Sequence, residues 1–244
     1  MEENMYFNVK LEFDHEKVEN DIINAIDKGT PHYVCAIESN NLTVANKNPQ
    51  FRQIVNSSLV NCCDGSVVAK MLGIIHHKPF DSYTGNDLFM RMIGMKRFRH
   101  FFLGNTPEVL GGLRKQLTAI DPKIEGMRFE TLPFRNVEEF DYKAIAKLIN
   151  ADYPDIIWVS LGAPKQEMFM AKLKPYLRRG VMVGIGAAFN FQSNTGSVKR
   201  APQWMIRLRL EWLYRACEEP QKNIPRYWGF IKILPKLLYS EKAA

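Results

Sequence analysis

The sequence predicts a doubly wound α/β fold with a mainly parallel, Rossmann-like sheet, followed by a helical C-terminal appendage. Short and almost continuously apolar segments, such as HYVCAI (32–37) and DIIWVSLG (155–162), are typical of strands that are buried on both faces. Amphipathic segments of helical period alternate with these strands along the chain. The 244 residues, of which 46% are hydrophobic, are enough to form one large core.

Each strand is expected from a short run of apolar, β-branched and aromatic residues. The first run alternates between apolar and polar residues like a half-buried strand, whereas most later runs are apolar throughout. The predicted strands cover residues 6–13, 32–37, 59–63, 99–104, 123–132, 155–162 and 181–189.

The helices are expected from apolar residues at helical spacing and from start and stop signals. Residues 15–29 place Val18, Ile22 and Ile26 on one face before a stop at Gly29. Another helix begins after Thr106, a residue type that caps helix N-termini. The predicted helices cover residues 15–29, 48–58, 65–73, 85–94, 106–120, 141–151 and 165–177. No helix is expected directly after the strand at 181–189.

The positive charge of the chain is concentrated at its C-terminal end. The net charge is +7, and residues 199–244 contribute +6 of it, together with three of the four tryptophans. We therefore divide the chain into an α/β domain (1–198) and a basic, Trp-rich appendage (199–244). A nucleic-acid-binding protein would spread basic and aromatic residues over a folded face, so no nucleic-acid partner is expected.

The cysteines and the chain's N-terminal segment indicate a reduced, cytoplasmic protein. Cys35, Cys62, Cys63 and Cys217 lack the paired spacing of a metal site, and no other cluster with ligand spacing is seen, so no metal is expected. Residues 1–13 are acidic and alternating rather than basic and then apolar, unlike a secretory signal. No apolar stretch is long enough to span a bilayer.

Two loops at the predicted carboxyl edge of the sheet are candidate anion sites. In the loop Gly162–Glu167, a helix N-terminus lies beside Lys165 and Gln166, which together suit a phosphate and sugar hydroxyls. A solvated helix start explains the same residues equally well. The second candidate is the loop that contains Gly104 and leads into the helix that Thr106 caps.

Several other motifs carry weaker signals. GIGAAF has Phe189 where a dinucleotide fingerprint needs its third glycine, which argues against an NAD enzyme. His76 and His77 are expected at the surface, and His100 is expected to be structural. Asp64 follows a strand and precedes a helix, so it is either a helix cap or a general base at the active edge.

Six motifs, in this order, resemble the bacterial WecG/TagA/CpsF glycosyltransferases. The resemblance runs from about Ile37 to Arg226, and the blocks LGAPKQE and VKRAP…W…LEWLYR…EP are the most specific. The motifs are CDGSVVAKMLG, YTGNDL, FFLG, DIIWVSLGAPKQE, GIGAAFNF and GSVKRAPQWMIRLRLEWLYRACEEP.

The resemblance implies an inverting, metal-independent transfer of a sugar from a UDP-sugar to an undecaprenyl-diphosphate-linked sugar, with no cofactor. The typical donor is UDP-N-acetylmannosamine or its uronic acid, and the product enters teichoic acid or another cell-surface polysaccharide. Another UDP-hexose donor (glucose, galactose or an N-acetylhexosamine) stays open, as does an inactive α/β module that docks on membranes. The expected location is the inner face of the bacterial cell membrane, and a homo-oligomer is possible.

The resemblance also assigns roles to individual residues. It makes Asp64 the catalytic base. The expected donor-binding residues are Asn40, Thr84, Gly85, Asp87, Gly104, Lys165, Gln166 and Asn190. The expected contacts to the acceptor diphosphate or an anionic membrane are Lys199, Arg200, Arg215, Lys222 and Arg226.

The chain departs from the family pattern at positions that bear on the donor. Glu38 stands where the family usually has Thr, and Ser82 stands where an Arg is common. Asn190 replaces an Asp, and Lys222 replaces an Arg. These differences leave the nucleotide class intact and the donor sugar open.

Overall fold

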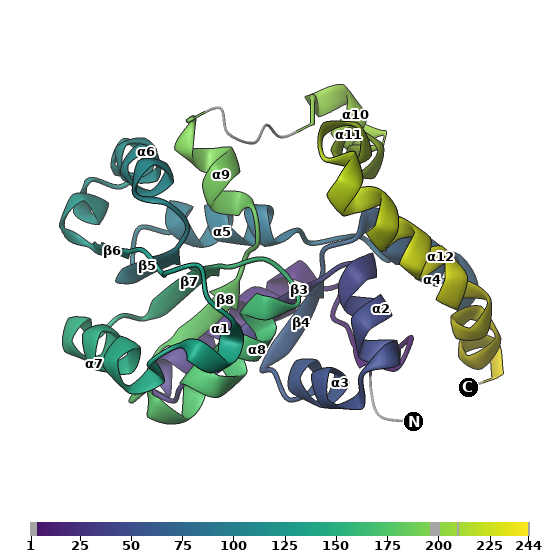
Figure 1. Ribbon diagram of the computed structural model, residues 1–244, viewed down its shortest axis with the longest axis horizontal. Coiled ribbons are helices and arrows are strands. Elements are labelled where there is room, and N and C mark those ends of the chain that lie inside the picture. Colours follow the sequence, from purple (N-terminus) through teal and green to yellow (C-terminus); the bar gives the residue numbers. More distant parts are fainter. Residues whose placement is uncertain (1–3, 196–200, 209, 244) are drawn as a thin grey trace.

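The computed structural model describes residues 4–195, 201–208 and 210–243, and these residues form a parallel six-stranded sheet with helices on both faces (Figure 1). The strand order is β4-β3-β8-β7-β5-β6, and every pairing within this sheet is parallel. The predicted doubly wound α/β fold is confirmed. The strands are β3 (His32–Ile37), β4 (Val60–Cys63), β5 (His100–Gly104), β6 (Arg128–Glu130), β7 (Ile156–Ser160) and β8 (Val181–Gly184).

The helices fall into a group before and a group after the middle of the chain. The first group is α1 (His15–Asp27), α2 (Ser39–Lys47), α3 (Pro49–Asn56), α4 (Ser66–His76), α5 (Gly85–Gly94) and α6 (Pro107–Thr118). The second group is α7 (Tyr142–Asp152), α8 (Lys165–Leu173), α9 (Ala188–Ser193), α10 (Gln203–Arg207), α11 (Glu211–Glu218) and α12 (Pro220–Ala243). Three short 3-10 turns are η1 (Pro122–Gly126), η2 (Val137–Glu139) and η3 (Lys174–Tyr176).

Alternate residues of each strand supply two separate cores. Val34, Trp158 and Val183 face α1, α5, α6 and α9, whereas the next residues along each strand face α2, α3, α4, α7 and α8. This period-two alternation explains why the strands read as continuous apolar runs, because both of their faces are covered.

The connections create a switch point between the neighbouring strands β3 and β8. The chain leaves β3 toward α2 on one face of the sheet and leaves β8 toward α9 on the other. In open α/β sheets, ligands bind outside the carboxyl ends of the strands at such a point. The carboxyl edge around β3, β4 and β8 is therefore where a site is expected.

The segment predicted as one strand, 6–13, is instead a small hairpin. Its strands are β1 (Met5–Tyr6) and β2 (Val9–Lys10), which pair antiparallel. The two residues between them, Phe7 and Asn8, both have positive φ, which is the geometry of a tight two-residue turn. Alternation of residue types alone did not reveal this turn.

Three further predictions of secondary structure were wrong. The predicted strand 123–132 contains the turn η1, and only β6 is extended. Helix α2 was not predicted, because its Asn-rich sequence has low helix propensity; burial of Leu42 and Ala45 stabilises it. The short helix α9 follows the GIGAAF motif, where no helix was expected.

The C-terminal part of the chain packs against the α/β body. Helix α12 lies along α2 (Figure 1), and its residues Phe230 and Leu237 are buried in the core on that face. Helix α12 is continuous and includes Pro225 and Pro235. The predicted domain boundary, 198/199, lies outside the described residues.

The far end of α12 is held by one carboxylate. Glu241 accepts hydrogen bonds from the Phe7 backbone N–H at 2.7 Å and pairs with the His76 ring at 2.8 Å. His76 is therefore half-buried under the helix rather than a plain surface residue. His100 is structural as predicted, since it is buried and accepts a hydrogen bond from the indole of Trp158.

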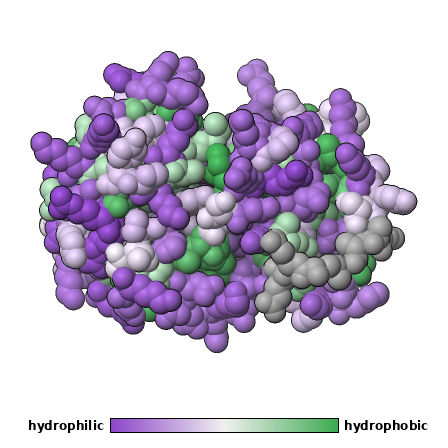
Figure 2. All heavy atoms as spheres, turned by 90° about the horizontal axis from the view of Figure 1, so that it is seen from below, coloured by the Kyte–Doolittle hydropathy of each residue, from purple (hydrophilic) through white to green (hydrophobic). Residues whose placement is uncertain are grey.

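The outward side of the C-terminal helices is rich in exposed apolar residues. Trp204 and Trp228 are 59% and 56% exposed, and Leu208, Trp212 and Ile231 are also exposed. By contrast, most of the side chains on the face shown in Figure 2 are hydrophilic, with apolar atoms in smaller areas between them. Within the described residues, no helix is both long and apolar enough to cross a membrane.

Candidate active site

Asp64 and Glu38 lie side by side at the carboxyl edge of the sheet. Strands β3 and β4 are paired in the register Ile37↔Cys63, so the next residue of each strand is an acid. The Asp64 backbone N–H donates to the Ile37 carbonyl at 2.9 Å, which continues the ladder by one step. The structure therefore brings together the predicted base and the acidic residue that replaces the family's Thr.

The Asp64 carboxylate is held by the start of helix α5. Its Oδ1 accepts a hydrogen bond from the Gly85 backbone N–H at 2.9 Å. Burial raises the pKa of Asp64 to about 6, whereas the Arg215 cation and the Gly85 N–H lower it. The carboxylates of Glu38 and Glu211 raise it further. A carboxylate with this pKa is mostly ionised at neutral pH and is more basic than an ordinary Asp, which suits a general base.

Local sequence explains why the chain presents Gly85 to Asp64. Thr84 caps α5 by accepting from the Asp87 backbone N–H at 3.1 Å, so the turn before it is fixed. A Cβ on Gly85 would lie 3.3 Å from the Ala36 side chain and 3.4 Å from the Ile185 backbone. A larger residue would force these neighbours to shift by a few tenths of an ångström, so glycine suits this close approach. Thr84 and Gly85 thus position Asp64, while Asp87 is exposed.

Arg215 brings a cation from the C-terminal helices to this edge. Its guanidinium pairs with Glu211 of the same helix at 3.1 Å and lies 5.2 Å from the Phe191 ring centroid. Although burial opposes the charge, Glu211 and Asp64 raise the pKa of Arg215. Arg215 therefore remains a cation beside the carboxylate group formed by Asp64, Glu38 and Glu211.

A second polar network joins the ends of β5, β7 and β8. The Asn105 amide donates to Asn190 Oδ1 at 2.8 Å and to Ser160 Oγ at 3.2 Å. Ser160 in turn donates to the Gly186 carbonyl at 2.8 Å. Gly104 is required here because its φ is +102° and a Cβ would lie 2.6 Å from the Ser160 carbonyl. The predicted residues Gly104 and Asn190 thus meet at one edge.

Gln166 and Glu167 are both buried beneath this network. Gln166 is 3% exposed; its Oε1 accepts from the Gly186 N–H at 3.1 Å, and its Nε2 donates to Glu167 at 3.0 Å. Burial raises the pKa of Glu167 to about 7, although the hydrogen bond from the Gln166 amide lowers it. Gln166 therefore orients the turn after β8.

The other predicted site residues have different surroundings. The Lys165 ammonium is 5.1 Å and 5.2 Å from the ring centroids of Phe134 and Phe140. Lys222 is exposed and pairs with Glu219 at 3.0 Å. Arg226 is half-buried. Burial raises the pKa of the neighbouring Tyr227, and the Arg226 charge acts against this rise. Lys199 and Arg200 lie outside the described residues.

Asn40 and Asn41 lie in the first turn of α2. Asn40 was predicted to bind the donor, whereas sequence reasoning missed Asn41. Asn40 and Asn41 are buried, and the Nδ2 atom of each has no hydrogen-bond partner among the described residues. The same holds for Oε2 of Glu167. Buried polar atoms without partners are rare and suit contacts to a ligand.

Other residues of the site were also missed by sequence reasoning. They are Asn105, Ser160, Glu167, Phe191 and Tyr227. Asn105 could have been found from the sequence, because it lies between Gly104 and Thr106 at the end of a predicted strand. The contacts of Phe191 and Tyr227 with the C-terminal helices had no signal in the sequence.

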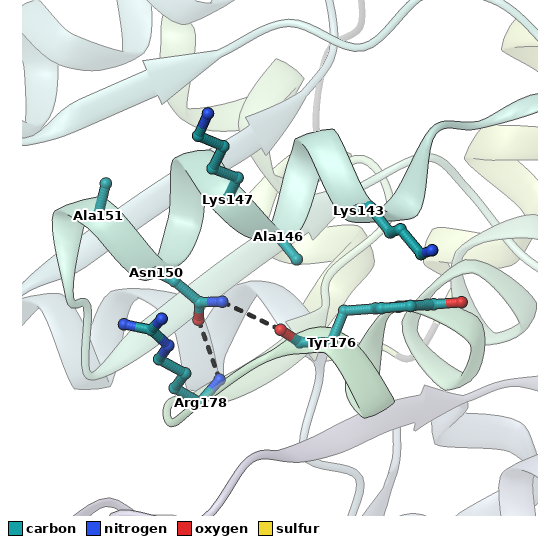
Figure 3. A pocket seen from close by; sticks show the side chains of 7 residues that line it. All are labelled: Lys143, Ala146, Lys147, Asn150, Ala151, Tyr176 and Arg178. Carbon is teal, nitrogen blue, oxygen red and sulfur yellow. Dashed lines mark hydrogen bonds between the residues drawn. The ribbon is translucent and has the colours of Figure 1, made fainter.

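The pocket shown in Figure 3 does not contain these residues. It has a volume of about 390 Å³ and is lined by α7 and by the segment before β8. Asn150, in its middle, donates to the Tyr176 carbonyl at 3.0 Å and accepts from the Arg178 N–H at 2.9 Å. Since its residues precede β7 and β8, the pocket lies toward the amino edge of the sheet. Among the described residues, no group of three His, Cys, Asp or Glu side chains is placed to hold a metal.

Comparison with known proteins defines the class. Residues 6–243 match the model of the glycosyl transferase WecG/TagA/CpsF family, so the chain belongs to this family and is a glycosyltransferase. It is similar to two proteins named N-acetylglucosaminyldiphosphoundecaprenol N-acetyl-beta-D-mannosaminyltransferase. The one from Bacillus subtilis (strain 168) is 30% identical over 74% of this chain and 71% of the relative. The one from Bacillus spizizenii (strain ATCC 23059 / NRRL B-14472 / W23) is 32% identical over 75% and 72%.

The position of Arg215 predicts a shift in the pH dependence of sugar transfer. In Arg215→Gln, the cation that lowers the Asp64 pKa is lost, so this pKa rises above about 6. The acid limb of kcat/KM against pH is therefore expected to move to higher pH. Arg178→Gln, in the pocket of Figure 3, is the matched control and leaves the limb in place. An unmoved limb in Arg215→Gln would show that the two side chains do not interact.

Proposed function

We propose that this protein transfers N-acetylmannosamine from UDP-N-acetylmannosamine to N-acetylglucosaminyl-diphosphoundecaprenol, with inversion at the anomeric carbon. The observation that carries the proposal is Asp64, a carboxylate with a pKa of about 6 at the switch-point edge, beside the Arg215 cation. The printed names of the two relatives support the sugar and the acceptor. The product belongs to teichoic acid or related cell-wall synthesis.

In the proposed reaction, Asp64 acts as the general base. It takes the proton from the acceptor hydroxyl while that oxygen attacks the anomeric carbon of the donor. The bond from this carbon to the diphosphate breaks, and UDP leaves with the electron pair. One displacement without a covalent intermediate inverts the configuration. The Gly85 N–H holds Asp64 in place throughout, because it hydrogen-bonds the oxygen Oδ1.

The remaining residues bind the two substrates in this proposal. The start of α6 after Gly104 and the start of α8, with Lys165, offer N–H groups and charge to the donor diphosphate. The unpartnered amides of Asn40 and Asn41 suit the hydroxyl and acetamido groups of the sugar. Arg215 and Arg226 neutralise the acceptor diphosphate, and Lys199, Arg200 and Lys222 are assigned the same role.

The direct test combines a panel of UDP-sugars with a short-chain lipid-diphosphate acceptor, with and without EDTA. We expect a product whose mass corresponds to one added N-acetylhexosamine, formed from UDP-N-acetylmannosamine. We also expect unchanged turnover in EDTA, since protein cations and helix N-termini serve the leaving group. A product from UDP-glucose or UDP-galactose alone would favour the other donor class. Loss of turnover in EDTA that Mg²⁺ or Mn²⁺ restores would contradict metal independence.

Replacing the base is expected to slow transfer without abolishing donor binding. Asp64→Asn keeps the size and the acceptor oxygen for Gly85 but cannot take a proton, so kcat should fall by roughly 10²–10⁴-fold. UDP binding, measured by calorimetry, should stay close to the parental value. Asp27→Asn, an exposed change in α1, is the control. If Asp64→Asn turned over at the parental rate, Asp64 would have only a structural role.

We propose further that the exposed face of α10–α12 brings the enzyme to the inner face of the cell membrane. Exposed tryptophans with neighbouring Lys and Arg suit an anionic lipid interface, where each cation contributes about 1 kcal/mol. The double variant Trp204→Ser, Trp228→Ser should then sediment less with anionic liposomes than the parent. Tyr153→Ser, which removes an equally exposed aromatic from the body, should not. Equal sedimentation of all three would argue against this docking face.

A further inference from the structure

Glu38 is fixed at the centre of the site by short-range contacts. It caps helix α2, and the Ser39 hydroxyl donates to its carboxylate at 3.2 Å. Its Cα is 3.7 Å from the position that a Cβ on Gly65 would occupy, so its backbone lies against the residue that follows Asp64. Its charge raises the pKa of Asp64 and of Glu167. The Glu38 carboxylate is therefore near enough to both carboxyl groups to act on them electrostatically.

The transferred sugar must lie beside the same residues. A base has to be within about 3 Å of the acceptor oxygen, and this oxygen has to be about 3–3.5 Å from the anomeric carbon. The sugar ring consequently lies within roughly 6 Å of the Asp64 carboxylate. Since Glu38 neighbours Asp64 in the strand register, substituents of that ring come near the Glu38 carboxylate.

The charges around this position are mainly negative. Asp64, Glu38, Glu167 and Glu211 contribute carboxyl groups. Two cations of the described residues, Arg215 and Arg226, act on the same surroundings, and Arg215 is paired with Glu211. The groups without partners at the same turn, the Nδ2 atoms of Asn40 and Asn41, are neutral donors. The surroundings of Glu38 thus offer hydrogen bonds to polar, uncharged substituents of the sugar and repulsion to an anionic substituent.

We propose that Glu38 is a specificity-determining residue that restricts the donor to sugars without a carboxylate. The inference rests on the proposed function and narrows it to neutral sugars such as N-acetylmannosamine, excluding the corresponding uronic acid. A carboxylate on the sugar would stand within a few ångströms of Glu38, and like charges at such distances are strongly unfavourable at a partly buried site. Discrimination here comes from repulsion of the wrong donor.

The test compares two donors that differ only at C6, UDP-N-acetylmannosamine and its uronic acid, in the full-length protein. For the parent, kcat/KM is expected to favour the neutral donor by at least tenfold. Glu38→Gln keeps the size of the side chain and removes its charge, so the ratio should fall by about 10–100-fold. Glu38→Thr removes the charge with a residue that also caps helices, and should change the ratio in the same direction.

Glu16→Gln is the matched control, because Glu16 is an exposed acid in the first turn of α1. It should leave the donor ratio unchanged. A second readout is the pH profile, since loss of the Glu38 charge lowers the Asp64 pKa and moves the acid limb to lower pH. A parent that prefers the uronic acid, or a ratio that Glu38→Gln and Glu38→Thr both leave unchanged, would overturn the inference.

Failure of the proposed function is distinguished by measuring donor binding without an acceptor. The Kd ratio of the two UDP-sugars, obtained by calorimetry for the parent and for Glu38→Gln, reports the discrimination independently of transfer. If no transfer occurs but the Kd ratio falls in Glu38→Gln, the proposed reaction is wrong and the role of Glu38 stands. If transfer occurs and neither ratio depends on Glu38, only the specificity inference is wrong.

Discussion

The site depends on keeping one carboxylate, Asp64, partly out of water and yet able to ionise. Burial alone would favour its protonated form, and the acids Glu38 and Glu211 act in the same direction. Two interactions oppose this rise: the hydrogen bond from the Gly85 N–H at the start of α5 and the charge of the Arg215 cation in α11. The result is a pKa of about 6, at which the group is ionised at neutral pH but remains a better proton acceptor than an exposed Asp.

The pKa of Asp64 therefore depends on how the C-terminal helices pack against the α/β body. Arg215 reaches Asp64 because α11 is followed by α12, which buries Phe230 and Leu237 in the core beside α2. At the far end of α12, Glu241 binds the Phe7 backbone N–H of the hairpin and the His76 ring. The same helices therefore have one side that completes the site and packs the core and another that is left apolar and exposed. The candidate site and the proposed docking face thus belong to one structural unit.

The second half of the edge is organised by hydrogen-bonded amides rather than by charge. Asn105, Asn190 and Ser160 connect the ends of β5 and β7 with α9, and Gln166 fixes the turn that follows β8. Connected polar groups of this kind can be worth more together than singly. The amides of Asn40 and Asn41, in contrast, have unused donors among the described residues. That contrast separates groups that hold the fold from groups available to a ligand.

The sequence by itself determined the elements whose signals are local. Apolar runs indicated the buried strands, Thr84 and Thr106 lie at helix starts, and motif order identified the family. It did not reveal the hairpin at Phe7 and Asn8, helix α2 or the continuous α12, because their stability comes from packing between segments far apart in the chain. The site divides in the same way. Asp64 could be predicted from its place after a strand, but only the tertiary structure places Glu38, Gly85 and Arg215 around it, since a pKa depends on neighbours in space.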